Sequence, residues 1–463
     1  MFSFSIDQGL VCLYLLGTLS LGLFKRSKTD VNSYLFAGRK LTVPAFVATL
    51  VATWYGGILE VGRFSFENGI VVWVIFGLFY YIAALIFIKF IVPKIISKHI
   101  RTIPEFIQNT YGRNSALIAT VFVILLVSPA PYIKMLATLL RHLWEMPELL
   151  ALVIGSVFSM IYAFSGGFSS VIRTDKLQFF LMFSGFALIL GTAISKYGGI
   201  SFLLENAPDY AFEIPGNFSW TFIFVWGFIA MITFIDPGFY QRCFAGNSVQ
   251  TVKKGIFISI IFWFIFDMMS IFTGIYASAI LPSNILGNPY LELADFVLSP
   301  ISRGFFMVSL LAIVMSTVDS FTFISAYTLG KDLPSAIKGN FSDLDSFTTR
   351  NTRFGLLATA IISIIIALWF PNAIDIWYTV GTLAIPVLLI PIISAMYGKP
   401  LKYPAFSMII SLTISSIWFI FGMLNKQNCW PVYPLGIEPL YPGLLTGIII
   451  YFSSYYLKST SRK

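Results

Sequence analysis

MVSLLAIVMSTVDSFTFISAYTLG, residues 307–330, is a membrane-length apolar segment with a cluster of oxygen-bearing side chains near its middle. Ser316, Thr317, Asp319 and Ser320 fall within five consecutive positions. Because residues three and four apart share a helix face, Ser316, Asp319 and Ser320 are predicted to lie along one stripe. A carboxylate in a lipid-spanning helix is costly and normally faces the bundle interior or a wet cavity. Hydroxyls and carboxylates bind hard cations such as sodium, so the segment predicts an ion site of a transport protein.

The rest of the chain is also dominated by apolar segments. The 463-residue sequence is 57% hydrophobic and 11% charged, with a mean hydropathy of +0.84. Soluble domains carry about 25% charged residues. The segments reach the roughly 17–25 residues needed to cross the hydrocarbon layer. Since backbone groups in lipid must be satisfied within the segment, each is predicted to be a helix. The composition therefore predicts an all-α polytopic membrane protein and argues against a large soluble helical protein.

We expect about thirteen transmembrane helices in a single membrane domain, residues 1–463. No linker or soluble module interrupts them, and the first residues lack the basic region and cleavage site of a signal peptide. The predicted spans are 5–24, 43–66, 69–92, 114–140, 148–164, 177–194, 218–240, 255–279, 303–330, 354–370, 375–397, 404–423 and 440–457.

The distribution of basic residues predicts the orientation of the chain. When the loops are assigned alternately to the two sides, one side receives most Lys and Arg residues, Arg242 among them. The positive-inside rule makes that side cytoplasmic, with the N-terminus outside and the C-terminus inside a plasma or bacterial inner membrane. This bias accounts for the net charge of +9, so no nucleic-acid partner is expected. The other side keeps little beyond Arg141, Lys196, Arg303 and Lys426.

Motifs for enzymatic chemistry are missing from the sequence. Cys12, Cys243 and Cys429 are scattered along the chain, and the two histidines form no ligand cluster with them. There is no Walker loop, G-x-S-x-G elbow or H-E-x-x-H pair. We therefore expect no enzyme, no cofactor and no metal other than sodium. Membrane lipid, sodium and a small-molecule solute are the expected partners, and no obligate protein partner is evident.

Two predicted spans contain helix-breaking residues at corresponding places. PAFVATLVATWYGGILEVGRFSF, residues 44–66, has Gly56 and Gly57 near its middle. SWTFIFVWGFIAMITFIDPGFYQR, residues 219–242, has Gly227 and then Asp236-Pro237-Gly238. Paired interrupted helices indicate inverted repeats with a binding site where the backbone unwinds. The alternative is that the glycines only let helices approach closely.

These breaks divide the chain into two inverted five-helix repeats, each starting with a broken helix. The first repeat is expected at about 43–194 and the second at about 218–397. A leading helix at 5–24 precedes them, and trailing helices at 404–457 follow.

Five sequence motifs resemble those of one family of membrane proteins. They are FAGRK (36–40), RTIPEFIQNTYG (101–112), YAFSGGFSSVIRTDKLQ (162–178), DPGFYQRCFAGNS (236–248), and MSTVDS with LGKDL (315–320 and 329–333). In this order they resemble the sodium/solute symporters, which include bacterial proline, sugar and sialic-acid transporters. The resemblance covers about residues 37–397. It implies a sodium-coupled secondary active symporter that imports a small polar organic solute by alternating access.

A proton-coupled symporter of the same fold is one alternative, in which Asp319 or Asp175 titrates. A non-transporting membrane sensor is another.

The resemblance also implies a sodium site. The hydroxyls of Ser316 and Thr317 match it, completed by backbone carbonyls near Leu50, Thr53 and Ile313. A small hard cation needs several oxygens, and broken helices supply free carbonyls. The alternative for each hydroxyl is a bond back to the carbonyl four residues earlier.

A second-ion or coupling site is expected at Asp175, Asp319, Ser320 and Lys134. Asp175 matches an aspartate of the family that assists sodium passage or binds a second sodium. We predict that Lys134 pairs with Asp319, so that its ammonium replaces a second sodium and one sodium moves per solute. The alternative is that Lys134 extends to the membrane interface.

The solute pocket is expected near the first break. Glu60 and Arg63 either pair or form an outer gate. Alternatively, Arg63 or Lys134 holds a solute carboxylate, which would favour an organic or amino acid over a neutral sugar. No role is assigned to Asp267. The predicted pocket residues are Trp54, Tyr55, Gly56, Gly57, Glu60, Arg63, Trp73, Phe76 and Trp226.

Overall fold

The computed structural model describes residues 5–23, 36–97, 101–341, 347–370, 372–427 and 430–460. Its α-helices are α1 (Ile6–Leu23), α3 (Val43–Trp54), α4 (Ile58–Asn68), α5 (Val71–Trp73), α6 (Phe79–Ile86), α7 (Val92–Ser97), α8 (Ile103–Tyr111), α9 (Arg113–Leu126), α10 (Ala130–Trp144), α11 (Glu148–Tyr197), α12 (Ile200–Asn206), α13 (Trp220–Ile229), α14 (Pro237–Ala245), α15 (Val249–Ile280), α16 (Pro289–Val297), α17 (Pro300–Tyr327), α18 (Leu333–Lys338), α19 (Phe347–Trp369), α20 (Ala373–Met396), α21 (Pro404–Leu424) and α22 (Leu440–Thr460).

Shorter segments complete the chain. The 3-10 and π-helical segments are η1 (Ala37–Arg39), η2 (Val74–Leu78), η3 (Phe87–Ile91), η4 (Asp209–Phe212), η5 (Ala230–Phe234), η6 (Thr328–Asp332) and η7 (Pro434–Gly436). Two short antiparallel strands, β1 (Lys426–Gln427) and β2 (Trp430–Pro431), lie between α21 and α22.

The predicted fold class, an all-α polytopic membrane protein, is confirmed. Eight of the described helices are long and apolar enough to span a membrane, or up to ten if each of two bent pairs counts as one span. The count of thirteen is not confirmed. Shorter apolar helices occupy three other predicted spans, at Ile6–Gly22, Glu148–Ile161 and Leu440–Ser454.

Both predicted helix breaks are present. The axes of α3 and α4 differ by 60°, and α14 is bent by 40° from the helix that ends at Phe234. In the second break Asp236 caps α14 by accepting a hydrogen bond from the backbone N–H of Phe239, with Pro237 in the first turn. This is the usual signature of a new helix start. The limits assigned to the two repeats and to the single domain stay a prediction.

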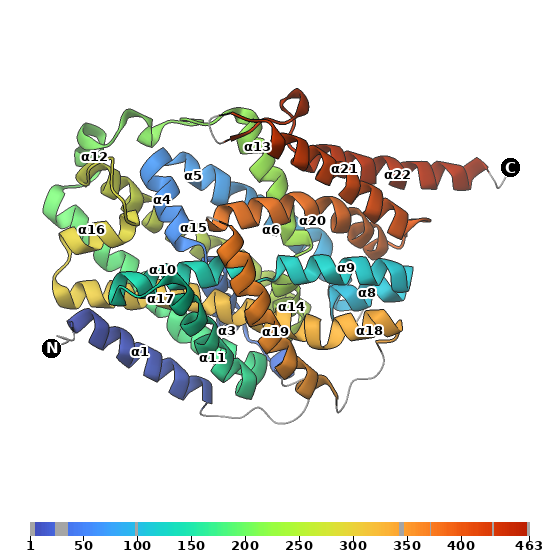
Figure 1. Ribbon diagram of the computed structural model, residues 1–463, viewed down its shortest axis with the longest axis horizontal. Coiled ribbons are helices and arrows are strands. Elements are labelled where there is room, and N and C mark those ends of the chain that lie inside the picture. Colours follow the sequence, from blue (N-terminus) through green and yellow to red (C-terminus); the bar gives the residue numbers. More distant parts are fainter. Residues whose placement is uncertain are drawn as a thin grey trace.

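Helix α17 forms the centre of the bundle. The most apolar part of the helix that continues from α17 to Lys338 is entirely buried. Helices α1, α3, α10, α11 and α19 pack against it, and Figure 1 shows α1, α11 and α19 beside the gold ribbon of α17. Polar side chains on this helix therefore face protein, which removes the cost of exposing them to lipid.

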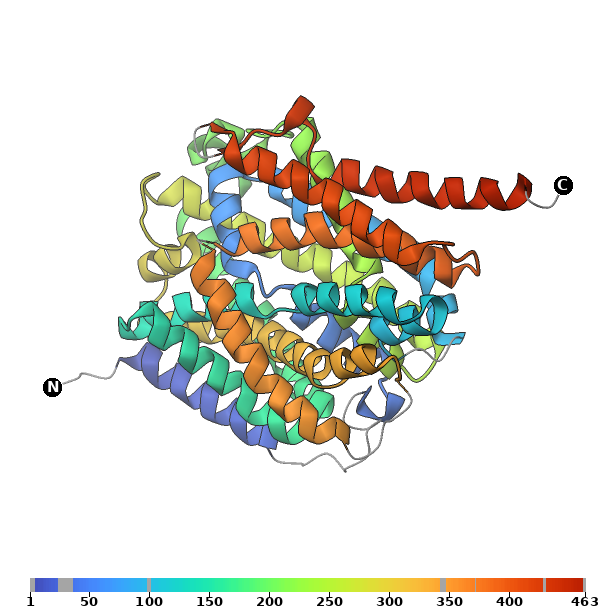
Figure 2. The same ribbon diagram turned by 45° about the vertical axis from the view of Figure 1, so that its right-hand side comes forward.

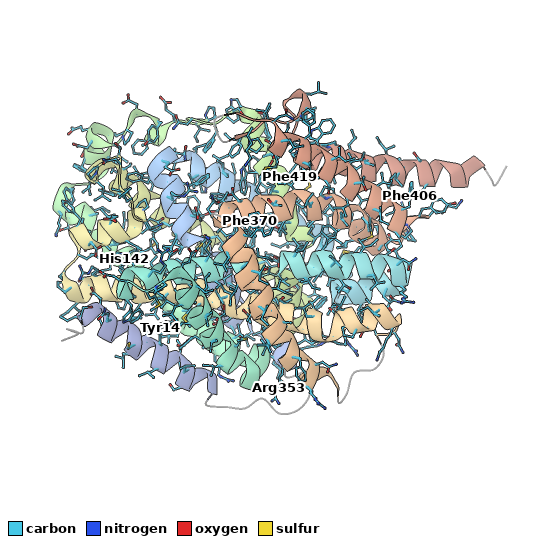
Figure 3. The ribbon with its side chains drawn as sticks, in the orientation of Figure 1. Tyr14, His142, Arg353, Phe370, Phe406 and Phe419 are labelled. Atoms are coloured by element: carbon cyan, nitrogen blue, oxygen red, sulfur yellow. The ribbon has the colours of Figure 1, made fainter. Side chains whose placement is uncertain are left out.

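The outer surface of the bundle is rich in large apolar side chains. Phe180 on α11 is 67% exposed and Phe406 on α21 is 58% exposed, and Figure 3 shows the latter among the side chains of α21. So extensive an apolar surface is expected against lipid and is a liability in water. The chain is a multi-pass membrane protein. In Figures 1 and 2, α1 begins on one side of the bundle and α22 ends on the opposite side.

Candidate functional site

The break between α3 and α4 brings two other helices close to its backbone. Tyr55, Gly56 and Gly57 form the turn between α3 and α4. A Cβ atom on Gly56 would lie 2.5 Å from the Cβ of Thr317 on α17, and one on Gly57 would collide with the Trp377 ring on α20. Carbon atoms normally keep about 3.5–4.0 Å apart. Only glycine at both positions allows this approach.

The five residues predicted to bind sodium lie on α3 and on α17, which pack against each other at this break. Thr317 Oγ1 donates a hydrogen bond of 2.8 Å to the carbonyl oxygen of Thr53. Ser316 Oγ lies 3.4 Å from Thr53 Oγ1. Leu50 and Ile313 are 3% and 0% exposed on α3 and α17. The predicted hydroxyls thus lie beside the end of α3, where backbone carbonyls lose their helical partners. Ion binding by these oxygens stays a prediction.

Arg242 was predicted in a cytoplasmic loop, and this prediction is wrong. Its side chain is 1% exposed and extends from α14 to the residues of the predicted ion sites. It donates to Thr53 Oγ1 at 2.6 Å and to Ser320 Oγ at 2.9 Å. Its Nη2 atom lies 3.8 Å from Oδ2 of Asp175, which also accepts a hydrogen bond from Thr49. A buried charge needs such partners, because an unpaired one costs several kcal/mol.

The predicted pair between Lys134 and Asp319 does not form in the structure. Lys134 Nζ donates to the carbonyls of Ala367 and Phe370 at 2.9 and 2.8 Å and lies 3.4 Å from Glu148 Oε1. These carbonyls lie at the end of α19, where helical carbonyls are unsatisfied. Asp319 Oδ1 instead accepts a 2.7 Å hydrogen bond from Ser159 Oγ. Lys134 was expected at the same depth as Asp319, but its side chain extends toward α19.

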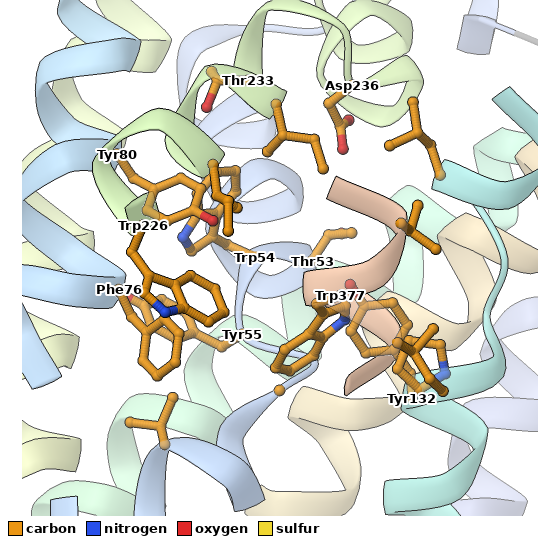
Figure 4. Close-up of a pocket in the computed structure, with 18 of the residues that line it drawn as sticks. Thr53, Trp54, Tyr55, Phe76, Tyr80, Tyr132, Trp226, Thr233, Asp236 and Trp377 are labelled. Carbon is orange, nitrogen blue, oxygen red and sulfur yellow. The ribbon is translucent and has the colours of Figure 1, made fainter. Parts of the chain in front are cut away.

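A central cavity of about 190 Å³ opens beside the first break. Figure 4 shows two aromatic walls, with Tyr80, Trp226, Trp54, Phe76 and Tyr55 on one side and Trp377 and Tyr132 on the other. Its lining side chains come from α3, α13, α10 and α20, among other elements. Of the predicted pocket residues, those that line the cavity are Trp54, Tyr55, Gly57, Phe76 and Trp226.

The remaining predicted pocket residues lie outside the cavity lining. Gly56 faces Thr317, as described above, and Trp73 packs edge-on against Phe264 with ring centroids 6.1 Å apart. Glu60 and Arg63 form the predicted pair, with Arg63 Nη2 2.9 Å from Glu60 Oε2. Neither Arg63 nor Lys134 lines the cavity, so the structure does not place either of them beside a solute carboxylate.

Several lining residues escaped the prediction. They are Tyr80, Tyr132, Thr233, Asp236, Asp267 and Trp377 among others. Asp267, which had no predicted role, accepts a hydrogen bond from the Tyr81 hydroxyl. The membrane depth of its carboxylate was the available signal, since such groups usually serve a cavity. An aromatic residue such as Trp377 carried no signal, because 17% of the chain is aromatic.

The loop before α22 reaches the end of the helix that carries Trp377. The Tyr378 hydroxyl, one residue further along α20, donates a hydrogen bond to Glu438, and its oxygen lies 3.3 Å from the Tyr433 hydroxyl. Burial raises the pKa of Glu438, and the Tyr378 hydrogen bond opposes this only in part. This contact links the loop before α22 to one wall of the cavity.

Comparison with known sequences gives one family. A model described as the Sodium:solute symporter family matches residues 34–410. The sodium/glucose cotransporter of Vibrio parahaemolyticus is 25% identical over 313 residues, which cover 59% of this chain and 55% of that protein. The sodium/pantothenate symporter of Haemophilus influenzae is 28% identical over 281 residues, 57% of this chain and 56% of that protein. The match thus spans little more than half of either relative. The osmoregulated proline transporter of Bacillus subtilis is 22% identical, with 94% of this chain and 93% of that protein covered.

Solved structures share the fold. A Na⁺-coupled sialic acid symporter in its substrate-bound outward-open state superposes with a TM-score of 0.75 at 17% identity, covering 97% of this chain and 96% of that one. A nucleobase-cation-symport-1 family transporter with bound bromovinylhydantoin gives a TM-score of 0.59 at 12% identity, covering 95% and 96%. Identities this low establish the shared architecture alone.

Proposed function

The chain belongs to the sodium:solute symporter family, and from this membership we propose that it is a sodium-coupled secondary active symporter. It imports a small polar organic solute by alternating access, with sodium as the coupling ion and no cofactor. The sodium ion occupies the contact between α3 and α17, and the solute occupies the central cavity. The relatives named for glucose, pantothenate and proline support coupled transport without indicating which solute this chain carries.

The observation that carries the proposal is the position of the hydroxyl pair. Ser316 and Thr317 are 0% and 1% exposed and lie beside the unwound end of α3. Their oxygens, with the carbonyls of Leu50, Thr53 and Ile313, would supply the several ligands that a hard cation requires. When sodium binds, Thr317 Oγ1 turns its lone pairs to the ion while the carbonyl of Thr53 becomes a second ligand.

The second-ion region supports one sodium per solute. The guanidinium of Arg242, rather than the ammonium of Lys134, supplies a fixed positive charge beside Asp175 and Ser320. A second cation there would have to displace or approach this charge at close range, which is unfavourable in a buried site. Asp319 accepts a hydrogen bond from Ser159. We assign its carboxylate a role in coupling or in setting the affinity of the sodium site.

The proposal includes an orientation. The N-terminus lies outside and the C-terminus lies in the cytoplasm of a plasma or bacterial inner membrane, in accord with the basic loops. The opposite positions of the start of α1 and the end of α22 support an odd number of crossings.

Sodium binding to the purified protein tests the proposal. We expect radiolabelled sodium to bind and to raise the melting temperature relative to potassium, because a ligand at 100 times its Kd stabilises by about 2.7 kcal/mol. The double variant Ser316→Ala/Thr317→Ala should lose both effects. Ser184→Ala/Thr413→Ala removes the same atoms from exposed helix positions whose hydroxyls bond back to their own helices, and it should behave like wild type. Sodium binding that survives in the first double variant refutes the site. Uptake driven by a pH gradient in the absence of sodium would replace sodium coupling with proton coupling.

A further inference from the structure

The charges that line the central cavity are all negative. Asp236 and Asp267 line it, whereas no Lys, Arg or His is among the described residues of its lining. Neither carboxylate lies within ion-pair distance of a basic side chain in the part of the chain that the structure describes. Buried carboxylates are normally paired or bind a cation, because desolvating an unpaired charge is costly. The buried Arg242 acts on Asp236 from outside the lining, but within the cavity the described residues offer these carboxylates no positive partner.

Only part of the hydrogen-bonding capacity of these carboxylates is used within the protein. Asp236 Oδ1 accepts a 2.6 Å bond from the backbone N–H of Phe239 at the start of α14, and its carboxylate faces the cavity in Figure 4. Asp267, 6% exposed, accepts from the Tyr81 hydroxyl. Both bonds come from uncharged donors, so they hold the carboxylates in place without neutralising a full charge.

The remaining walls are of the kind that binds cations. Trp54 and Tyr80 pack edge-on with ring centroids 5.3 Å apart, and across the cavity Tyr132 and Trp377 lie 5.9 Å apart. Aromatic faces attract ammonium groups through the ring quadrupole, by about 2 kcal/mol or more where water is excluded, and several such rings form the cages that bind quaternary ammonium ligands. Aromatic walls alone would also suit an apolar or sugar ligand, but the two carboxylates that line the same cavity favour a cation.

The cavity also offers hydrogen-bonding groups for an uncharged or acceptor group of a ligand. Trp226 Nε1 and Thr233 Oγ1 belong to cavity-lining residues that are 2% and 0% exposed, and neither atom has a hydrogen-bond partner among the residues that the structure describes. An indole N–H can only donate, so it requires an acceptor such as a hydroxyl or carboxylate oxygen. The volume of about 190 Å³ lies below the roughly 300–1,000 Å³ of drug-sized sites, which indicates a small solute.

We propose that the solute is a small amine-bearing compound whose positively charged ammonium group, protonated or quaternary, lies between Asp236, Asp267 and the aromatic walls. An acceptor oxygen of the same solute receives the hydrogen bonds of Trp226 and Thr233. The inference rests on the proposed function, because it assigns the substrate class of that transport site. It replaces the expectation of a basic side chain that holds a solute carboxylate.

Equilibrium binding to the full chain in lipid nanodiscs tests the inference, with tryptophan fluorescence and melting temperature as readouts. The ammonium probes are tetramethylammonium, choline and glycine betaine, and the comparison solutes are glucose and lactate, all at constant sodium concentration. We expect the ammonium probes to bind, and choline or glycine betaine to bind more tightly than tetramethylammonium because only they offer an acceptor oxygen. No response to any ammonium probe at millimolar concentration overturns the proposal.

Charge-removing variants connect this binding to the two carboxylates. Asp236→Asn keeps a side-chain oxygen that can cap α14, since Asn is as good a cap as Asp. Asp236→Asn and Asp267→Asn should each weaken probe binding at least tenfold. Asp209→Asn makes the same change at an exposed position and should leave it unchanged. Wild-type affinity in both cavity variants overturns the assignment.

Two further measurements distinguish a wrong substrate class from a wrong proposed function. Tyr80→Phe retains the ring and should retain ammonium affinity, whereas Tyr80→Leu should lose it, so the proposal stays testable if an aspartate variant does not fold. Radiolabelled sodium binding is measured in parallel without solute. Sodium-dependent binding of glucose or lactate but of no ammonium probe would overturn the substrate class and leave sodium symport standing. Absence of sodium binding would instead overturn the proposed function.

Discussion

Substituting Gly56 tests whether the close approach of the first break to α17 controls sodium affinity. The Cβ of Gly56→Ala would lie 2.5–2.6 Å from three atoms of the Thr317 side chain. Restoring normal contact at about 3.5 Å requires Thr317 to move by about 1 Å. Such overpacking costs about 1–3 kcal/mol. Because Thr317 Oγ1 is a proposed ligand, we expect most of this cost to appear in sodium binding, as a loss of about 5- to 100-fold at 1.4 kcal/mol per tenfold.

The assay is a sodium titration of the melting temperature and of radiolabelled sodium binding, with two matched glycine variants. Gly57→Ala makes the same chemical change one residue later, but its Cβ meets Trp377 and should therefore weaken solute binding more than sodium binding. Gly191→Ala on α11 adds a Cβ that meets no atom within 4 Å and should change neither. Unchanged sodium affinity in a folded Gly56→Ala protein would refute the reasoning, as would an equal sodium loss in all three variants.

Three other predictions concern charges. Arg242→Gln removes the buried partner of Asp175, so the melting temperature should fall by the equivalent of about 3–5 kcal/mol; a change within error in thermal unfolding would contradict this. Lys134→Met should lower the melting temperature through lost contacts with α19 while sodium and solute affinities stay at wild type, and an altered sodium requirement would revive a coupling role. Glu438 binds its proton more tightly in the folded protein, so its contribution to stability is largest at acidic pH and falls as pH rises from the unfolded value near 4.5 through the raised pKa. Glu438→Gln should flatten this decline in pH-dependent melting curves, and an unchanged slope would show that another group causes it.

The fold could be predicted as far as local signals decide it. The length of the apolar segments identified the spans. The Gly56-Gly57 and Asp236-Pro237 pairs indicated both helix breaks, because these residues alter the conformation of the backbone at their own positions. The α11 segment could not be foreseen. Two spans were expected here, at 148–164 and 177–194, with a loop between them; the structure does break the helical backbone at Gly167 (φ 57°, ψ −155°), but the second helix begins at Gly167 and leaves no loop before residue 177. Arg173 and Asp175 lie in this second helix with partners from distant segments, which are the carbonyls at the end of α1 for Arg173 and the Thr49 hydroxyl with Arg242 for Asp175.

The site residues could likewise be predicted where a local sequence pattern contains them, but their partners on distant helices could not. Ser316 and Thr317 could be predicted because they share one helix and its face, and one sequence motif covers them. The Lys134 prediction relied on equal depth along two different helices, which leaves the rotation of each helix undetermined. Arg242 looked like a loop residue because charge count alone placed it in the cytoplasm. Its position about a turn and a half into α14 was readable from the Asp236-Pro237 helix start, but its partners on α3 and α17 were not.

The geometry of the first break gives a physical reason why two ligands should bind cooperatively. Gly56 touches Thr317 of the proposed ion site, and Gly57, the next residue, touches Trp377 of the cavity wall. A shift of this turn toward α17 therefore also changes its distance from α20, so neither site can adjust alone. If sodium fixes Thr317 and the Thr53 carbonyl, the turn is fixed as well, and the solute meets a cavity that is already arranged. By linkage the solute must then raise sodium affinity by the same factor. Because both contacts belong to adjacent residues of one turn, this coupling requires no relay through the rest of the bundle, and substitutions at Gly56 and Gly57 should reduce it more than substitutions in either site alone.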